Sequence, residues 1–429
     1  MNNFLSERDS KVIWHPYTQH QKMEDPIPIM KGEGALLFDE KGNSYIDAVS
    51  SWWVNLHGHG HPYIAEKLYK QALALEHVIF THFTHEPAVS LAERLLDILP
   101  GKLSKIFYSD NGSTAVEVAL KMAIQFWRNK DQPYRNKILA FNNAYHGDTF
   151  GAMSVSSRGL FTNAFKDFLF DTVFIETPNA DNLEEIKSIL RSHQGQIAAF
   201  IYEPLLQAAG GMRMYQAKYL DDLLSFIRTE NILCIADEVL TGFGRTGPLF
   251  ASESISHKAD MICLSKGLTG GSMALGITAC NQDIFNAFLS TDRTKTFFHG
   301  HSFTANPLAC TAGLASLDLL EKKSCRDQIQ WICNEHVKFV QNELSLVGME
   351  LIINIRIAGT ILAFELSTGK DEYINEVGAT VMNSALSHGI YLRPLGNTVY
   401  LMPPYCITPQ QLRIIYKFIL SIPDFIRKY

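Results

Sequence analysis

A lysine stands directly after a short apolar run near the middle of the chain. The run MICL (261–264) is followed by Ser265 and Lys266, and then by a loop that contains Gly267, Gly270 and Gly271. Lysine is almost never fully buried without a partner, so an amine at the tip of a core strand needs an explanation. One explanation is nucleophilic chemistry, because burial lowers the pKa of an amine and leaves it neutral for attack on a carbonyl carbon.

Acidic residues end two other apolar runs. FIYEP (200–204) carries Glu203 at its end, and LCIADE (233–238) carries Asp237 and Glu238. Pyridoxal phosphate chemistry requires a lysine amine for a Schiff base and a carboxylate that keeps the pyridine nitrogen protonated. Asp237 and Lys266 are the candidates for these two roles. A structural Asp–Lys ion pair is the other interpretation of the two residues alone.

A phosphate site is predicted where a helix begins. Asn111, Gly112 and Ser113 follow the predicted strand KIFYS (105–109) and lie at the start of the helical pattern 113–129. The free amides and the dipole of a helix N-terminus bind anions, and glycine lets a ligand approach the backbone closely. Ser113 is also a suitable N-cap residue, and the capping and phosphate roles are compatible.

The elements that must position these residues are strands and helices in alternation. KILAF (137–141), AAFIY (198–202), LCIA (233–236) and MICL (261–264) are apolar throughout, as is typical of strands covered on both faces, and helical stretches such as 216–230 lie between some of them. This order predicts an α/β fold with a mostly parallel sheet, in which ligands bind at the carboxyl ends of the strands. AGTILAFEL (358–366), a helical stretch near 373–388 and YLRPLGNTVYLMPP (391–404) predict a smaller α+β unit, with a boundary near residue 320.

Composition excludes several classes of protein. The 429 residues are 46% hydrophobic and 19% charged, which is typical of a globular chain with more than one domain. A net charge of −6 without a Lys/Arg run argues against nucleic-acid binding. Charged residues near the N-terminus and the lack of an apolar stretch of ~20 residues argue against a signal peptide and a membrane span. Seven scattered cysteines without a Cys-x-x-Cys pair favour reduced thiols and a cytoplasmic location.

Longer motifs resemble a known family. IADEVLTGFGRTGPLFASE (235–253) with CLSKGLTGG (263–271) resembles the class III pyridoxal-phosphate aminotransferases, which have fold type I. Other segments are similar to the branch of that family that aminates 8-amino-7-oxononanoate in biotin synthesis: IWHPYTQ (13–19), DAVSSWWVNLHGHGHP (47–62), AYHGDTFGAMSVS (144–156), EPLLQAAGGMRMY (203–215), HGHSFTANPLAC (299–310) and LRPLGNTVYLMPPY (392–405).

The resemblance implies a domain organisation and an assembly. A large cofactor-binding domain is expected over residues 56–320. A small domain is expected from the two chain ends, with residues 1–55 joining residues 321–429. The family forms homodimers with shared active sites, and this chain carries Gly300-His301-Ser302 where many members have Gly-Pro-Thr. Serine keeps a hydroxyl for the partner's phosphate, whereas His301 replaces a rigid ring by a titratable one.

The resemblance also implies roles for individual residues. Lys266 is expected to be catalytic. Pyridoxal 5'-phosphate is expected to be held by Gly112, Ser113, Tyr145, Asp237 and Lys266, and by His301 and Ser302 of the neighbouring subunit. The substrate pocket is expected to include Tyr17, Trp52, Trp53, Tyr145, Gly300 and Arg393.

The implied substrates fit the chemistry of these side chains. Tryptophans suit the apolar chain of 8-amino-7-oxononanoate, and a guanidinium suits its terminal carboxylate. From the residues alone, ordinary core positions and a binding pocket are equally good interpretations of Trp52 and Trp53, and Arg393 would be a surface charge. The expected donor is S-adenosylmethionine, although some relatives use lysine. The alternative within the family is an ω-aminotransferase of the 4-aminobutyrate or ornithine type.

Three other classes of protein fit the sequence less well. GFGRTG (242–247) matches a dinucleotide-binding pattern, but Pro248 follows at once where that pattern requires a helix. The alternating histidines of HGHGH (57–61), and His82 with His85, lack a nearby carboxylate pattern for a metal, so we expect the former to shape a loop beside the substrate pocket. A non-catalytic binding protein is disfavoured because Lys266 is present.

Overall fold

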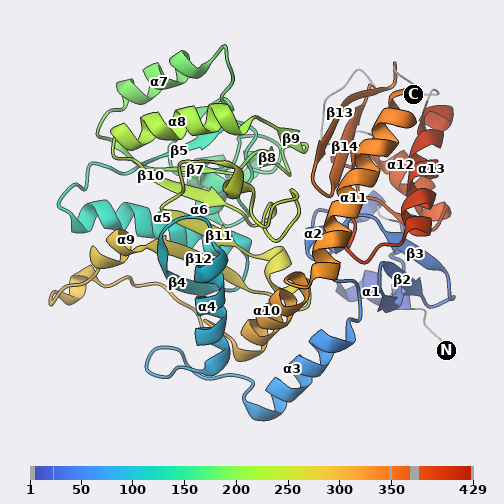
Figure 1. Cartoon of the computed structure of the whole chain (residues 1–429), viewed down its shortest axis with the longest axis horizontal. Helices are drawn as coiled ribbons and strands as arrows, with labels where there is room; N and C mark the ends of the chain where they lie inside the picture. Colours follow the sequence, from blue (N-terminus) through green and yellow to red (C-terminus); the bar gives the residue numbers. More distant parts are fainter. Residues whose placement is uncertain (1–4, 23, 347–349, 368–375, 427–429) are drawn as a thin grey trace.

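The computed structural model describes residues 5–22, 24–346, 350–367 and 376–426. A seven-stranded sheet lies at the centre of the larger part of the molecule (Figure 1). In spatial order it contains β4 (Leu103–Ser109), β12 (Gly276–Asn281), β11 (Met261–Leu264), β10 (Leu233–Asp237), β7 (Ile197–Tyr202), β5 (Lys137–Phe141) and β6 (Thr172–Ile175). β12 is antiparallel to both of its neighbours, and the pairs from β11 to β6 are parallel.

The predicted α/β fold is confirmed, and most of its central strands are found where the apolar runs placed them. The runs 137–141 and 261–264 coincide with β5 and β11, and the helical patterns correspond to α5 (Gly112–Asn129) and α8 (Ala217–Thr229). Two strands of the sheet, β6 and β12, were not predicted. β12 does not form a continuous apolar run, because it contains Gly276, Thr278 and Asn281.

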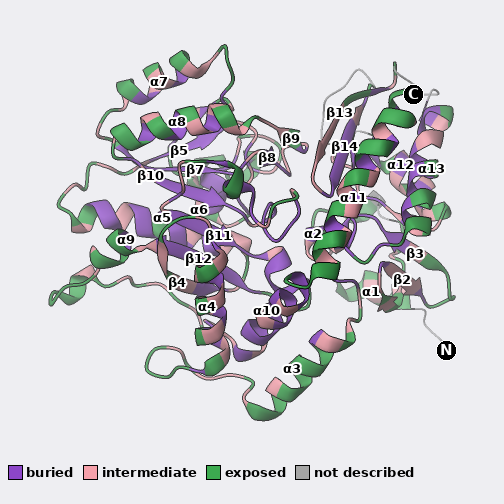
Figure 2. Cartoon of the chain, viewed as in Figure 1, coloured by how far each residue is buried: buried purple, intermediate pink, exposed green. Residues whose placement is uncertain are grey.

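The central strands are apolar throughout because both of their faces are covered. Ala236 and Ile262 belong to the core cluster that includes the buried side of α8. Ile235 and Met261, one residue earlier in each strand, belong to a second cluster with the buried side of α5. Successive side chains of a strand point to opposite faces, so neighbours in sequence enter different clusters. Figure 2 shows the resulting buried layer between helices whose outer sides are exposed.

The smaller part of the molecule combines both ends of the chain. One sheet has the order β1 (Ile29–Glu33), β2 (Leu36–Asp39), β3 (Ser44–Asp47) and β15 (Ile390–Tyr391), with β3 and β15 parallel. A second sheet contains β13 (Ile352–Ala358), β14 (Ile361–Leu366) and β16 (Thr398–Leu401). These sheets lie near α11 (Lys323–Asn342), α12 (Glu376–Ser387) and α13 (Pro409–Ile426), so that N-terminal and C-terminal segments are neighbours in Figure 1. The expected α+β unit from the two ends is therefore present.

The predicted segments of that unit contain a strand and a helix. In the run 358–366, Gly359, with a φ of +59°, turns the chain between β13 and β14. The helix expected near 373–388 is described from Glu376 onward, and residues 373–375 lie outside the described residues. The expected boundary at residue 320 coincides with the end of α10 (Pro307–Leu320), and the division into 1–55, 56–320 and 321–429 stays a prediction.

The other α-helices and strands connect or cover these sheets. They are α1 (Leu5–Val12), α2 (Ser50–Trp53), α3 (Pro62–Ala74), α4 (Glu86–Ile98), α6 (Phe150–Ser154), α7 (Leu183–Ser192), α9 (Gln282–Asn286) and the hairpin strands β8 (Leu206–Gln207) and β9 (Arg213–Met214). Within the described part of the chain, none of the helices has both the length and the apolar character of a membrane span.

Candidate active site

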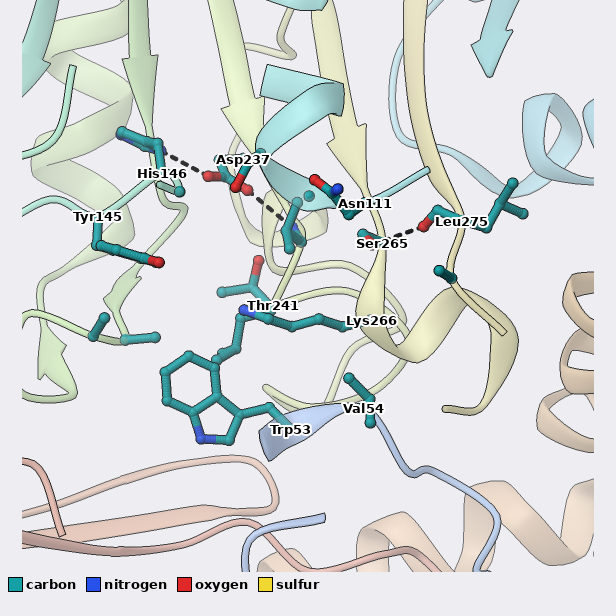
Figure 3. Close-up of a pocket in the computed structure, with 18 of the residues that line it drawn as sticks. Trp53, Val54, Asn111, Tyr145, His146, Asp237, Thr241, Ser265, Lys266 and Leu275 are labelled. Carbon is teal, nitrogen blue, oxygen red and sulfur yellow. Dashed lines mark hydrogen bonds and ion pairs between the residues drawn. The ribbon is translucent and has the colours of Figure 1, made fainter. Parts of the chain in front are cut away.

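A cavity of about 420 Å³ lies beyond the carboxyl ends of β10 and β11. Five residues predicted to hold the cofactor line it, namely Gly112, Ser113, Tyr145, Asp237 and Lys266. They come from the start of α5, from the loop after β5 and from the ends of two neighbouring parallel strands. Figure 3 shows that Lys266 and Trp53 approach one another across this cavity from separate segments.

Lys266 has the electrostatic environment of a reactive amine. Its Nζ lies 4.5 Å from the centre of the Trp53 ring, and its backbone is left-handed, with a φ of +46°. Burial lowers the pKa of the Lys266 amine to about 8, although the charges of Asp237 and Glu203 oppose the shift. A larger share of the amine is therefore neutral near pH 7.5 than in an exposed lysine.

Asp237 is held by a residue that the sequence did not indicate. His146 Nδ1 lies 2.7 Å from Asp237 Oδ2, and the Val239 amide donates to Asp237 Oδ1 at 3.1 Å. The His146 side chain is fully buried, so this contact fixes the orientation of the carboxylate toward the cavity (Figure 3). The available signal was the place of His146 beside Tyr145 in the motif AYHGDTF, but a lone histidine has many possible roles.

Glu203 supports the same site from the end of β7. It accepts hydrogen bonds from the backbone amides of Tyr145, at 3.0 Å, and Ala208, at 2.9 Å. Burial raises the pKa of Glu203 to about 7, and the charge of Asp237 adds to the rise while that of His146 opposes it. Glu203 therefore positions the Tyr145 backbone, and its carboxyl group binds a proton more readily than that of an exposed glutamate.

The start of α5 forms a cradle that fits a phosphate group. The helix is capped by Asn111, which accepts from the Thr114 amide at 2.9 Å, so the interpretation of Ser113 as the N-cap was wrong. A Cβ atom on Gly147 would lie 2.1 Å from Ser113 Oγ, and one on Gly112 would lie 2.7 Å from a Val239 methyl group. The backbone here is packed too closely for other residues, as at a site that receives a ligand on free amides.

The residues present therefore fit pyridoxal phosphate. The N-terminus of α5 is suited to its phosphate, the Asp237 carboxylate to its pyridine nitrogen and the Lys266 amine to its aldehyde. When bound, this cofactor supplies an electron sink that stabilises negative charge on a substrate carbon.

Four predicted substrate residues form an aromatic and cationic group beside the cavity. The guanidinium carbon of Arg393 lies 3.7 Å from the centre of the Trp52 ring and 6.0 Å from that of Tyr17. The Tyr17 hydroxyl lies 3.1 Å from the Tyr145 hydroxyl and also donates to Asp148. Tyr145 belongs to this group and to the lining of the cavity, so the two are continuous.

Trp52 and Trp53 lie on a left-handed turn. Ser50, Ser51, Trp52 and Trp53 have φ values of +53°, +44°, +67° and +76°. Each L-residue in this region costs about 1–2 kcal/mol, so surrounding contacts must hold the segment. Trp53 is only 4% exposed, and its Nε1 donates to the Tyr400 hydroxyl at 2.9 Å. The core interpretation is therefore confirmed for Trp53 and wrong for Trp52, which is 40% exposed. The role of both residues in binding substrate stays a prediction.

The remaining predicted residues do not meet this cavity. Gly300, His301 and Ser302 lie in the loop that precedes α10, and none of them lines it. The prediction that they act in the site of a neighbouring subunit concerns a dimer, and it stays a prediction.

Two motifs from the competing interpretations have structural roles. Arg245 of GFGRTG is buried, and its guanidinium donates to the carbonyl oxygens of Trp53, Asn55 and Pro403. His57 and His59 contact Ser316, at 3.0 Å, and Asp47, at 2.9 Å. Among the described residues, no three His, Cys, Asp or Glu side chains are placed to hold a metal ion.

Comparison with known proteins identifies the family. The model of the family described as Aminotransferase class-III matches residues 17–422. The chain belongs to the class-III aminotransferases. These enzymes use pyridoxal phosphate, in agreement with the fit described above.

Individual relatives of this class-III aminotransferase are similar over nearly their whole length. The chain is 46% identical to the adenosylmethionine-8-amino-7-oxononanoate aminotransferase of Synechococcus elongatus, over 96% of this chain and 98% of that one. It is 41% identical to the enzyme of the same name from Geobacter sulfurreducens, over 95% and 94%.

Solved structures show the same likeness. The adenosylmethionine-8-amino-7-oxononanoate aminotransferase of Methanocaldococcus jannaschii is 35% identical, with a TM-score of 0.93 and 98% of each chain covered. An omega transaminase from Pseudomonas jessenii, solved in complex with PMP, is 27% identical with a TM-score of 0.91 and covers 98% of each chain.

Proposed function

We propose that this aminotransferase transfers an amino group to 8-amino-7-oxononanoate, giving 7,8-diaminononanoate in biotin synthesis, with S-adenosylmethionine as the donor. The observation that carries the proposal is Arg393 stacked on Trp52 beside the cavity. An aromatic wall that ends in a guanidinium fits a long apolar chain that ends in a carboxylate. The names of the similar enzymes support the same reaction.

Within this proposal the chain's own residues divide the work. Lys266 Nζ, with its lowered pKa, takes and returns a proton at the reacting carbon. Asp237, oriented by His146, holds the pyridine nitrogen of the cofactor, and Gly112 with Ser113 binds its phosphate. The remaining site roles follow the sequence prediction: Tyr145 contacts cofactor and substrate, and Tyr17, Trp52, Trp53 and Arg393 contact substrate.

The proposal includes a homodimer in which Gly300, His301 and Ser302 reach the neighbouring site. Its support is that these residues do not line the cavity of their own chain. A cytoplasmic location is also proposed. All seven cysteines are free thiols, as is usual in a reducing compartment.

A turnover assay tests the function. Purified holoenzyme is incubated with 8-amino-7-oxononanoate and either S-adenosylmethionine or lysine, and the diamine product is quantified. We expect product with S-adenosylmethionine. Product only with lysine would correct the donor. No amination of 8-amino-7-oxononanoate, together with turnover of 4-aminobutyrate or ornithine, would replace the proposal by the alternative within the family.

A further inference from the structure

One buried carboxylate accepts hydrogen bonds from the start of the left-handed turn at residues 50–53. Asp47 is the last residue of β3, and its side chain is fully buried. Its Oδ1 accepts from the amides of Val49, at 3.2 Å, and Ser51, at 3.0 Å, and its Oδ2 accepts from the Ser51 hydroxyl at 2.7 Å. These bonds fold the chain back over the end of the strand, and without them the amides at the start of the turn would lose their partner.

A histidine from the HGHGH motif supports that carboxylate. His59 Nε2 lies 2.9 Å from Asp47 Oδ2, and His59 Nδ1 lies 3.1 Å from the Asn55 side-chain amide. The His59 backbone pairs with Gly34 in both directions, so its ring is anchored to the β1–β2 region. Burial alone would raise the pKa of Asp47, but hydrogen bonds from His59 and Ser51 lower it below its ordinary value. The two backbone amides, the Ser51 hydroxyl and His59 thus stabilise the Asp47 side chain as an anion.

The same turn aims the two tryptophans at different parts of the site. Trp52 stacks against Arg393 in the proposed carboxylate pocket, and Trp53 lies against Lys266 in the proposed cofactor pocket. The left-handed turn thus places two neighbouring side chains in two adjoining pockets. Two further contacts hold the far side of the turn, from the Ser50 hydroxyl to the Met402 carbonyl and from Arg245 to the Trp53 carbonyl.

We propose that Asp47 and His59 are positioning residues for substrate recognition: the pair holds the turn that places Trp52 against Arg393. The proposal deepens the function proposed above and rests on it for the identity of the acceptor. Neither residue touches substrate or cofactor in this scheme. Losing the pair therefore affects acceptor binding more than cofactor binding, because the start of α5, Asp237 and Trp53 are held by separate contacts, Trp53 by Tyr400 and Arg245.

The test compares Asp47→Ala and His59→Ala with wild type as holoenzymes. The matched control is His257→Ala, which removes a His–Asp pair with Asp221 of similar length, 2.8 Å, remote from the turn. We expect the Asp47 and His59 variants to raise the KM for 8-amino-7-oxononanoate between about tenfold and 100-fold, as for a displaced binding group, with normal cofactor absorbance. The control is expected to keep the wild-type KM.

A rescue variant separates positioning from general stability. In the Asp47→Ala background the Ser51 hydroxyl has lost its partner, and glycine at position 51 adopts a φ of +44° without the penalty of a side chain. The double variant Asp47→Ala/Ser51→Gly is therefore expected to have a lower KM than Asp47→Ala, between that of the single variant and that of wild type. A KM that is unchanged in folded Asp47→Ala enzyme, or that rises only together with loss of cofactor, would overturn the proposal.

Two further measurements keep the result decisive. If Asp47→Ala does not fold, His59→Ala is judged by the same KM criterion. Near-UV circular dichroism reports the tryptophan environment without any substrate, and we expect it to change in both variants but not in the control. If wild-type enzyme does not aminate 8-amino-7-oxononanoate, the proposed function fails, and an unchanged near-UV spectrum in both variants would then overturn the positioning role as well.

Discussion

The lowered pKa of Lys266 makes a quantitative prediction for cofactor binding. With a pKa of about 8, about a quarter of the amines are neutral at pH 7.5, against about one in a thousand at the ordinary value of 10.5. The neutral amine is the form that attacks an aldehyde. The site should therefore offer roughly 200 times more reactive amine than an exposed lysine at this pH.

The assay is the rate at which pyridoxal phosphate binds covalently to apoenzyme, followed by visible absorbance from pH 6.5 to pH 10.5. We expect the rate to rise with a midpoint near 8, whereas Nα-acetyl-lysine in the same assay rises toward its own pKa near 10.4. Glu203→Gln removes a charge that favours the ammonium form, so its midpoint should be lower than that of wild type. Glu184→Gln, on the exposed side of α7, should not move it.

A stability measurement checks the same pKa independently. Because the folded-state pKa is below the unfolded one, the unfolded chain binds more protons at Lys266 between pH 8 and 10.5. This group therefore makes the free energy of unfolding of apoenzyme rise with pH in that window, and Lys266→Met should remove that part of the slope. A midpoint near 10.4 in the binding assay, with the same slope for wild type and Lys266→Met, would refute the assigned environment of the amine.

Three further predictions concern the rest of the site. Asp237→Asn should slow proton abstraction by orders of magnitude while cofactor still binds, and His146→Ala should cause a smaller loss in the same half-reaction kinetics; a wild-type rate in both would contradict the pair. Arg393→Ala should raise the KM for 8-amino-7-oxononanoate by about one to two decades and leave the cofactor spectrum normal, since a charge-assisted pair contributes about 1.5–3 kcal/mol. Arg393→Lys should also be impaired, because it keeps the charge without the planar fork. Tight binding of 8-amino-7-oxononanoate by Arg393→Ala would show that Arg393 does not anchor the carboxylate. Mixed dimers of Lys266→Ala and Ser302→Tyr should recover part of the activity that each variant lacks, and no recovery after verified subunit exchange would show that each site is built from one chain.

The sequence was sufficient to predict strands whose residues are all apolar and whose two faces are both buried in the structure. The runs 137–141 and 261–264 are apolar because both faces of the sheet are covered, so they were readable without knowledge of what covers them. The same logic located Asp237 and Lys266, since polar residues at the ends of such runs stand out against their neighbours. β12 was missed because its burial depends on the strands beside it and not on a continuous apolar pattern.

Only the tertiary structure could decide how distant polar groups pair. His146 and Asp237 are far apart in sequence, and neither has a local pattern that names the other. The left-handed turn at residues 50–53 contains no glycine, so the sequence has no local signal for it. Contacts from Asp47, Met402 and Arg245 hold this turn.

What the sequence by itself determined is the kind of chemistry, through an amine, a carboxylate and a helix start at strand ends. What only the tertiary structure decided is the state and direction of those groups. The pKa of Lys266 depends on burial and on the charges of Asp237 and Glu203, and the directions of Trp52 and Trp53 depend on a strained backbone. The Lys266 pKa and the tryptophan directions both depend on residues that are distant in sequence and close only in the folded protein. No single stretch of the sequence therefore predicts them.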